Sequence, residues 1–330
     1  MPWTTDVVRV RVPATSANLG PGFDALGLAL SLHDEVDAWV CASGLSIEVS
    51  GEGADLAGAG EDHLVVQAMR AAFAVTGGQP PGLGLRCVNR IPHGRGLGSS
   101  AAAIVAGILA ARALAQPMAQ SGAGPLPDDA LLGLATELEG HSDNVAACLS
   151  GGLTIAWTSD GQPWMVRLEP LASIRPVICV GPAPVRTEVA RRLLPDLVPH
   201  RDAAANAGRS ALLVAALTQP SAGGLEGALL AATRDWLHQD YRAAAMPETA
   251  ALVGLLRAAG IPAVVSGAGP SVLALLCCPE KGGPEQPDYR YHLDCLGSIV
   301  RETGIAWHVS SLDIERQGAR VLRPEPPPGC

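Results

Sequence analysis

The segment at residues 91–103, IPHGRGLGSSAAA, restricts the possible folds of this chain more than any other. Residues 83–88 before it alternate in apolar character, which predicts a β-strand. Residues 101–111 after it form an unbroken run of small and branched apolar residues, which predicts a buried helix too short to span a membrane. The segment therefore predicts a strand, a glycine-rich turn and a helix N-terminus in succession.

This turn has the chemistry of an anion site. Gly94, Gly96 and Gly98 lack a Cβ, so the backbone can take positive φ and approach a ligand closely. Ser99 and Ser100 stand where helix caps stand, and the free N–H groups of the first turn point outward. The helix dipole adds about half a positive charge there, which favours a phosphate. A tight turn that only caps a buried helix is the alternative.

Several other motifs are excluded. A Walker A loop needs a lysine after its last glycine, and the only lysine of the chain is Lys281. The glycine spacing also differs from a dinucleotide-binding fingerprint. The sequence contains no GxSxG and no HExxH, so a serine hydrolase and a zinc site are both disfavoured. The eight cysteines form no CxxC pair, which indicates reduced core thiols in a cytoplasmic protein.

Length and charge narrow the class further. A chain of 330 residues predicts two domains. A net charge of −9 argues against a nucleic-acid partner or an anionic membrane surface. Asp6, Arg9 and Arg11 leave no apolar region for a signal peptide, so we expect a soluble, cytoplasmic protein.

The first part of the chain predicts strands that flank a polar loop. Residues 7–12 predict a strand ended by Pro13, and residues 14–24 a loop that is a candidate binding loop because of Asn18 and Asp24. An ordinary turn with an Asx cap is the alternative for that loop. Further elements are a strand pair joined through Gly44 and a helix, at residues 35–41, 45–49 and 62–75.

A polar cluster follows the predicted helix at residues 130–139, after a surface loop at residues 116–129. Residues 137–145, ELEGHSDNV, place five polar groups before an apolar run. They predict a helix end that also lines a site, with Asp143 or Asn144 capping the next helix.

The second half predicts a separate domain. We place the domains at residues 1–170 and 171–322, with a disordered, proline-rich tail at residues 323–330. Strands and helices mix without strict βαβ repetition, so the fold class is α+β. The expected elements lie, in chain order, at residues 151–157, 176–180, 187–194, 202–217, 248–259, 263–266, 271–276, 292–303 and 307–309.

A phosphate site without lysine still needs positive charge. Backbone N–H groups, arginine and Mg²⁺ remain, and Mg²⁺ prefers a few oxygen ligands. Ser100 and a carboxylate from either Glu137 or Glu139 can supply them, and spacing alone does not choose between the two glutamates.

Several stretches together resemble the GHMP kinases, the galactose, homoserine, mevalonate and phosphomevalonate kinase group. Residues 92–101 resemble its ATP loop and residues 265–271 its C-terminal glycine motif. Residues 12–24 and 139–145 resemble the homoserine kinase branch in particular. The matches occur in the expected order over residues 7–272.

The resemblance implies an N-terminal domain like the second domain of ribosomal protein S5 and a ferredoxin-like C-terminal domain, with ATP between them. It implies ATP-dependent phosphorylation of the L-homoserine hydroxyl, with Mg²⁺ held by Ser100 and Glu137, which we choose over Glu139. It also implies a homodimer. The ATP-binding residues would be Pro92, His93, Gly94, Arg95, Gly96, Leu97, Gly98, Ser99, Ser100, Ala101 and Ala102.

The resemblance also assigns the substrate site. The catalytic residues would be Asn18, Asn144, Ser100 and Thr187. Two arginines suit a carboxylate because each can donate a planar pair of hydrogen bonds, and Asp24 suits the ammonium group. The homoserine-binding residues would be Asn18, Asp24, His141, Asn144, Arg191, Arg242 and Gly267.

Asn144 stands where many relatives have a catalytic aspartate, and an amide cannot act as a base. The resemblance therefore implies direct in-line transfer without a side-chain base, which a loose transition state permits. The sequence departs from the pattern at four positions: His63 replaces an asparagine, Ser142 a proline, Trp236 an arginine and Asp240 a proline.

Two alternative functions remain to be weighed. Another kinase of the same family is disfavoured because the mevalonate-type lysine and aspartate are absent from the motifs. A catalytically dead sensor on the same fold is disfavoured by the intact serine, glutamate and arginine set.

Overall fold

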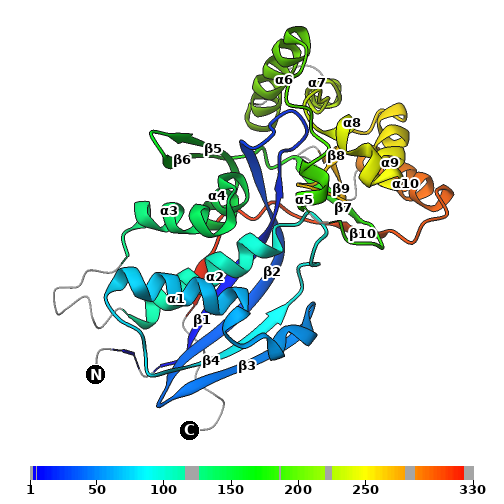
Figure 1. Cartoon of the computed structure of the whole chain (residues 1–330). Coiled ribbons are helices and arrows are strands. Elements are labelled where there is room, and N and C mark those ends of the chain that lie inside the picture. Colours follow the sequence, from blue (N-terminus) through cyan, green and yellow to red (C-terminus); the bar gives the residue numbers. More distant parts are fainter. Residues whose placement is uncertain are drawn as a thin grey trace.

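The computed structural model describes residues 3–4, 6–115, 126–185, 187–219, 225–278 and 287–322. Figure 1 shows two β-sheets, each covered by helices, with the turn between the first two strands reaching toward the second group of helices. The predicted loop at residues 116–129 and the tail at residues 323–330 lie largely outside the described residues.

The first sheet has seven strands in the order β11-β1-β2-β4-β3, with β5 pairing both β2 and β6. These strands are β1 (Val8–Ala17), β2 (Leu26–Cys41), β3 (Gly44–Gly51), β4 (Gly82–Asn89), β5 (Leu153–Ser159), β6 (Gln162–Leu168) and β11 (Arg320–Leu322). The last of them returns the chain to the edge of β1.

Two predictions about this sheet were wrong. Strand β1 does not end at Pro13 but continues to Ala17, because a β-bulge between Pro13 and Ala14 shifts the register and accommodates the proline. Strand β3 does not form a hairpin with β2 but pairs in parallel with β4. Strands β6 and β11 were not predicted.

Helices cover one face of the first sheet (Figure 1). Helices α1 and α2 pack on each other and form, with strands β1, β2 and β4, the main core of buried apolar side chains. The elements are η1 (Ala54–Asp62), α1 (Leu64–Thr76), α2 (Ser99–Leu114), α3 (Asp128–Glu139) and α4 (Ser142–Ser150). The predicted strand–turn–helix around residues 91–103 is therefore present.

The second sheet has four strands in the order β10-β7-β9-β8. Its strands are β7 (Ile174–Val180), β8 (Ala263–Val265), β9 (Val272–Cys277) and β10 (His308–Ser311). The helices are α5 (Thr187–Arg191), α6 (His200–Thr218), α7 (Leu225–Ala232), α8 (Gln239–Arg242), η3 (Ala243–Ala245), α9 (Pro247–Ala258) and α10 (Pro287–Glu302). The predicted pairing of β8 with β9 is confirmed.

Polar contacts join the two halves of the chain next to the glycine-rich turn. The Gly267 N–H donates to the carbonyl oxygen of Ala17 at 3.1 Å. The Ser266 hydroxyl lies 2.8 Å from the hydroxyl of Ser16 and donates to the carbonyl oxygen of Gly96 at 2.7 Å. Among the described residues, no helix is long and apolar enough to cross a membrane.

Candidate functional site

A cavity of about 730 Å³ opens where the two halves of the chain meet. Six segments converge on it: the β1–β2 turn, the glycine-rich turn, the α3–α4 junction, α5, α8 and the β8–β9 turn. Its lining residues are Asn18, Asp24, Gly94, Gly96, Gly98, Ser99, Ser100, Glu139, His141, Asp143, Asn144, Val185, Thr187, Arg191, Arg242, Gly267, Ala268 and Gly269.

The glycine-rich turn forms a cradle of exposed backbone. Gly94, Gly96 and Gly98 have φ values of 65°, 70° and 69°, which L side chains rarely adopt. A Cβ on Gly96 would lie 2.1 Å from the carbonyl oxygen of Ser266, and one on Gly98 would lie 2.0 Å from Oγ1 of Thr15. The turn can therefore pack this closely only without side chains at these positions.

Helix α2 begins at this glycine-rich turn, and the backbone N–H groups of its first turn are available as hydrogen-bond donors. Its N-cap is Gly98, which supplies no side-chain hydrogen bond, so Ser99 and Ser100 are the first helical residues rather than caps. The N–H groups of the first turn lack helical partners, and they lie at the positive end of the helix dipole. The arrangement suits a phosphate at the floor of the cavity.

Glu139, and not Glu137, faces the cradle. The Ser100 hydroxyl donates to Oε2 of Glu139 at 2.5 Å, and Glu139 lines the cavity. Glu137 lies on an exposed face of α3 and is not among the lining residues. The choice of Glu137 therefore disagrees with the geometry, because Glu139, the last residue of α3, contacts Ser100, whereas Glu137 is exposed.

Ser100 and Glu139 offer two oxygen donors beside the phosphate cradle, which fits Mg²⁺, a cation that keeps several waters and shares substrate phosphates. Burial raises the pKa of Glu139, and the hydrogen bond from Ser100 offsets part of that rise. A cation at this position would compensate the buried carboxylate. The described residues contain no cluster of three or more histidine, cysteine or acidic side chains that could hold a metal by itself.

A second cavity of about 880 Å³ shares Ser99 and Ser100 with the first. Its wall is mainly apolar, and it extends from the cradle along α1 and β2. Its lining residues are Val12, Asp34, Val36, Leu56, Ala59, Asp62, His63, Leu64, Val65, Asn89, His93, Ser99, Ser100, Ala102, Ala103 and Ala106. Burial lowers the pKa of His63, whose Nδ1 atom is buried without a hydrogen-bond partner.

Asp34 holds the chain segment that leads from β4 into the glycine-rich turn. Its Oδ1 accepts hydrogen bonds from the backbone N–H groups of Arg90 at 2.6 Å and Ile91 at 2.9 Å. Burial raises the pKa of Asp34, and these two bonds offset part of that rise. Asp34 therefore fixes the point where β4 leaves the sheet and the glycine-rich turn begins.

At the other end of the cavity, Asp24 and Arg191 form an ion pair. The Arg191 guanidinium donates to the two carboxylate oxygens of Asp24 at 2.7 and 3.1 Å. Asn18 holds the Asp24 loop, because its Oδ1 accepts the Asp24 N–H at 2.9 Å while its Nδ2 donates to the carbonyl oxygen of Gly267 at 2.9 Å. Asn18 and Asp24 both have positive φ, of 68° and 54°, which marks a strained, specified turn.

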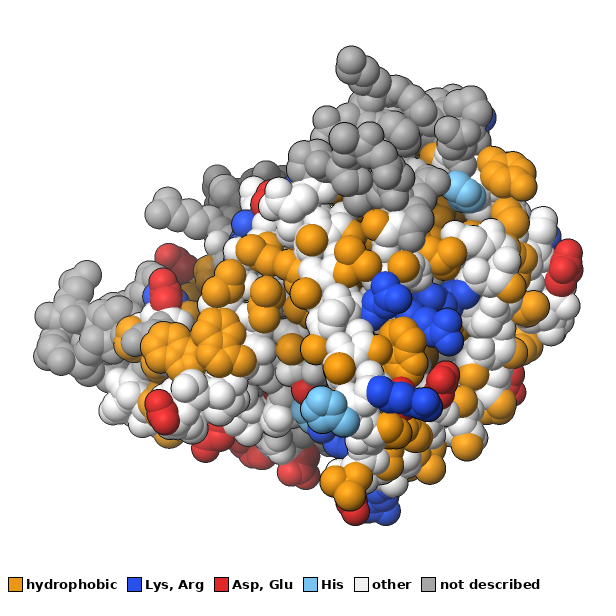
Figure 2. All heavy atoms as spheres, turned by 90° about the horizontal axis from the view of Figure 1, so that it is seen from above, with side chains coloured by type: hydrophobic (Ala, Val, Ile, Leu, Met, Phe, Trp, Pro, Cys, Tyr) orange, Lys and Arg blue, Asp and Glu red, His pale blue; other side chains and the backbone are white. Residues whose placement is uncertain are grey.

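Arg242 is the most unusual charge in the site. Its side chain is only 2% exposed, and among the described residues no carboxylate forms an ion pair with it. Burial and the nearby Arg191 lower the pKa of Arg242. Its guanidinium lies 5.0 Å from the centre of the Phe23 ring, and Arg191 lies 5.6 Å from the same ring. The face seen in Figure 2 carries a compact group of basic side chains among hydrophobic ones.

Asp143 lines the cavity and belongs to the segment at residues 137–145 that the sequence predicted both to cap a helix and to line a site. Helix α4 is capped instead by His141, without a side-chain hydrogen bond, so the predicted cap at Asp143 or Asn144 was wrong. Burial, reinforced by Asp24, raises the pKa of Asp143 to about 7. The polar cluster at residues 137–145 was the available signal, but the sequence did not show which of its side chains face the cavity.

The remaining predicted residues divide between the cavity and the core. His141, Asn144, Thr187 and Gly267 line the first cavity, and Oδ1 of Asn144 accepts the Thr15 hydroxyl at 2.9 Å. Burial and Arg191 lower the pKa of His141. Within the ATP loop, Gly94, Gly96, Gly98, Ser99 and Ser100 line the first cavity, and His93, Ser99, Ser100 and Ala102 line the second. Residues that line neither cavity are Pro92, Arg95, Leu97 and Ala101.

Comparison with known proteins is consistent across sequence and structure. Residues 63–152 match the GHMP kinases N terminal domain, and residues 213–286 match the GHMP kinases C terminal domain. The homoserine kinase of Streptomyces coelicolor is 54% identical over 96% of this chain and 94% of its own length. That of Clavibacter michiganensis is 55% identical over 81% of this chain and 82% of its own.

The fold agrees with solved structures of the same group. The homoserine kinase of Cytophaga hutchinsonii superposes with a TM-score of 0.77 and 26% identity, covering 96% of this chain and 98% of that one. The mevalonate kinase of L. major, at 15% identity and a TM-score of 0.63, shares the fold.

Proposed function

The chain belongs to the GHMP kinase family, within its homoserine kinase group, and on this premise we propose that it transfers the γ-phosphoryl group of ATP to the side-chain hydroxyl of L-homoserine. The products are O-phospho-L-homoserine and ADP. The first cavity supports this reaction, because its glycine-lined cradle suits a phosphate. Its far end carries Asp24 and Arg191, which complement the two charges of an amino acid zwitterion.

The two adjoining cavities divide the nucleotide between them. The cradle and the first turn of α2 receive the phosphates through backbone N–H groups. The mainly apolar second cavity receives the adenosine, and His63, whose pKa is lowered by burial, is one of its lining residues. Ser99 and Ser100 border both cavities and mark the point where nucleoside and phosphates join.

Ser100 and Glu139 would hold Mg²⁺ beside the phosphates. The ion, when bound, neutralises negative charge on the phosphates as it develops during transfer. Glu139 replaces Glu137 in this role because, of the two glutamates, it is Glu139 that accepts the hydrogen bond from the Ser100 hydroxyl.

Homoserine enters by exchanging partners with the Asp24–Arg191 pair. Its ammonium group binds Asp24, and its carboxylate binds Arg191 together with the buried Arg242, which forms no ion pair with a carboxylate among the described residues. Two guanidinium groups bind a carboxylate strongly because each can donate parallel hydrogen bonds. This orientation directs the substrate hydroxyl toward the cradle.

The reaction proceeds by positioning and charge stabilisation, without an obligatory side-chain base. In a loose transition state the attacking oxygen is weakly bonded, so early removal of its proton gains little. Asn144 offers only an amide there, and both polar ends of Asn18 already hold the β1–β2 turn. We assign Asn144 and Thr187 to orientation of the substrate, and Asn18 to holding the Asp24 loop in place.

The test is ADP release with Mg·ATP and L-homoserine, L-serine, L-threonine or mevalonate as acceptor. Turnover should be highest with L-homoserine, and the product should carry phosphate on the side-chain oxygen. Nucleotide binding without turnover of any acceptor would instead favour a sensor on the same fold.

A further inference from the structure

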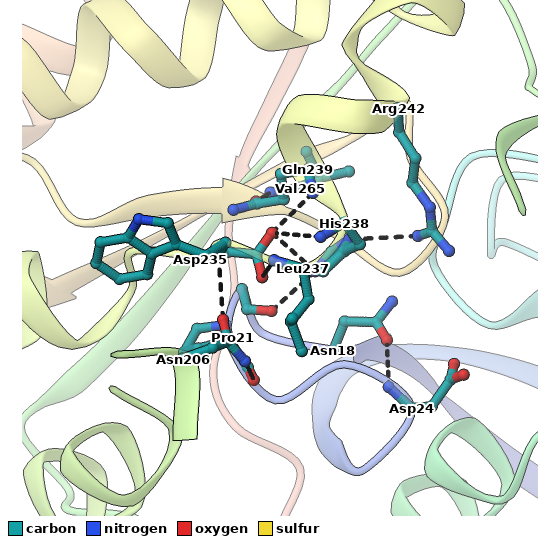
Figure 3. A network of polar contacts seen from close by, with 12 residues as sticks. Asn18, Pro21, Asp24, Asn206, Asp235, Leu237, His238, Gln239, Arg242 and Val265 are labelled. Carbon is teal, nitrogen blue, oxygen red and sulfur yellow. Dashed lines mark hydrogen bonds and ion pairs between the residues drawn. The ribbon is translucent and has the colours of Figure 1, made fainter. Parts of the chain in front are cut away.

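Among the described residues, the guanidinium of Arg242 has one hydrogen-bond partner, the imidazole of His238. Nδ1 of His238 lies 3.4 Å from Nη1 of Arg242 and four residues before it, across the single turn of α8. His238 is completely buried. In Figure 3, the side chains of Arg242 and Asp24 lie on the same side of His238.

The other contacts of His238 fix its tautomer. Nε2 lies 2.8 Å from the carbonyl oxygen of Gly20, which can only accept, so Nε2 carries the proton. Nδ1 is then an acceptor and faces a guanidinium that can only donate. Burial lowers the pKa of His238, and Arg242 adds to this effect against the opposing charge of Asp235.

Asp235 is held by backbone N–H groups just before and at the start of α8 rather than by Arg242. Its carboxylate accepts the N–H groups of Leu237 at 2.9 Å, His238 at 2.9 Å and Gln239 at 2.7 Å, as the dashed lines of Figure 3 show. It also lies 3.7 Å from Nε2 of His238. The imidazole therefore separates the nearest buried carboxylate of this segment from the guanidinium.

We propose that His238 is a positioning residue for substrate binding: as a neutral acceptor it orients Arg242 toward the homoserine carboxylate without neutralising its charge. This role rests on the proposed function. A carboxylate at position 238 would pair with Arg242 and compete with the substrate, whereas a neutral imidazole leaves the full positive charge available.

His238 also ties this arginine to the loop that carries Asp24. Its ring stacks on Phe23 with centroids 4.9 Å apart, and Nε2 anchors Gly20 in the same turn. The Phe23 ring in turn lies against Arg191 and Arg242. His238 therefore contacts both the arginine and the turn that carries Asp24.

Two substitutions separate the two hydrogen bonds. In His238→Asn an amide oxygen can take the place of Nδ1, while the bond to Gly20 is lost. In His238→Gln the longer side chain can keep a donor for Gly20 but offers no acceptor at the Nδ1 position. We expect His238→Gln to raise the homoserine KM about tenfold or more, as loss of a hydrogen bond to a charged group implies. In His238→Asn the homoserine KM should stay much closer to the wild-type value, because an acceptor for Arg242 remains. The KM for ATP and kcat should change little in both variants.

A double-mutant cycle with Arg242→Ala provides the second measurement. If His238 acts through Arg242, then His238→Gln should add nothing to the homoserine KM once Arg242 is absent. Additive effects, an equal defect in His238→Asn and His238→Gln, or a matching rise in the KM for ATP would each overturn the proposal. Absence of wild-type turnover with L-homoserine would refute the proposed function itself, and so is distinguishable.

Discussion

Asp24 and Arg191 are 167 residues apart in the chain, yet they meet across the cavity as a two-pronged ion pair of 2.7 and 3.1 Å. The same two side chains carry the charges that complement an amino acid zwitterion. The two side chains therefore neutralise each other in this structure. A bound amino acid can replace this ion pair, because its ammonium group can pair with Asp24 and its carboxylate with Arg191.

Breaking this pair should affect binding more than stability. Its side chains are 40% and 38% exposed, and ion pairs this exposed contribute about 1 kcal/mol or less to folding. We expect Asp24→Asn and Arg191→Ala each to raise the homoserine KM by a factor that corresponds to about 1.5–3 kcal/mol of binding free energy, with Tm nearly unchanged. Steady-state kinetics and thermal denaturation test this, with the exposed neighbour Arg192→Ala as the control. An equal effect in the control would contradict the assignment.

Arg242 should show the opposite balance between stability and function. A buried cation without an ion-pair partner costs folding free energy, so Arg242→Met should raise the Tm of the ligand-free protein. The same variant should raise the homoserine KM by a factor that corresponds to about 1.5–3 kcal/mol or more of binding free energy, because the substrate carboxylate loses a partner. Calorimetry and kinetics on one preparation check both effects. Unchanged homoserine kinetics would show that this arginine is wrongly assigned.

The metal assignment is testable with a matched pair of glutamates. Glu139→Gln and Ser100→Ala should lower kcat and shift the Mg²⁺ dependence to higher concentrations, since each removes an oxygen donor. Glu137→Gln, two residues earlier on the exposed face of α3, should behave as wild type. A Mg²⁺ titration of the rate distinguishes them, and the reverse pattern would restore Glu137 as the ligand.

Asp143 predicts a characteristic dependence of stability on pH. Burial raises its pKa in the folded protein to about 7 from an ordinary value of 3.8, so the folded state binds more protons than the unfolded state between these values. Its contribution to the free energy of unfolding should therefore be largest at low pH and fall as the pH rises toward 7. Denaturant titrations of wild type and Asp143→Asn at pH 5 and pH 8 measure this, and the variant should lose less stability between them. Parallel profiles would contradict it.

The cradle should tolerate no side chain at Gly98. Alanine there would need a φ of 69° and would place Cβ 2.0 Å from Oγ1 of Thr15, so the turn must move. We expect Gly98→Ala to raise the KM for ATP, while Gly133→Ala, on the open side of α3, leaves it unchanged. Fluorescent-nucleotide binding would measure the change directly, and unaltered binding would mean that the turn does not contact phosphate.

The sequence by itself determined the local elements and the chemistry of the motifs. The glycine-rich turn was predictable because glycine spacing, an apolar strand and an apolar helix are properties of consecutive residues. The arginines and the acidic loop residue were identified as binding groups because four motifs coincided in the expected order. Local patterns therefore gave the family, the α+β fold and most residues that line the cavity.

Only the tertiary structure decided how these groups are paired. It placed β3 beside β4 rather than β2, and it brought Ser100 to Glu139 rather than Glu137. It also revealed that Arg242 is buried, with no ion pair to a carboxylate among the described residues, and that it is contacted by His238, which the sequence did not identify as a site residue. Which side chain faces which depends on long-range packing and strand order, because burial and hydrogen bonding are properties of contacts that consecutive residues do not specify.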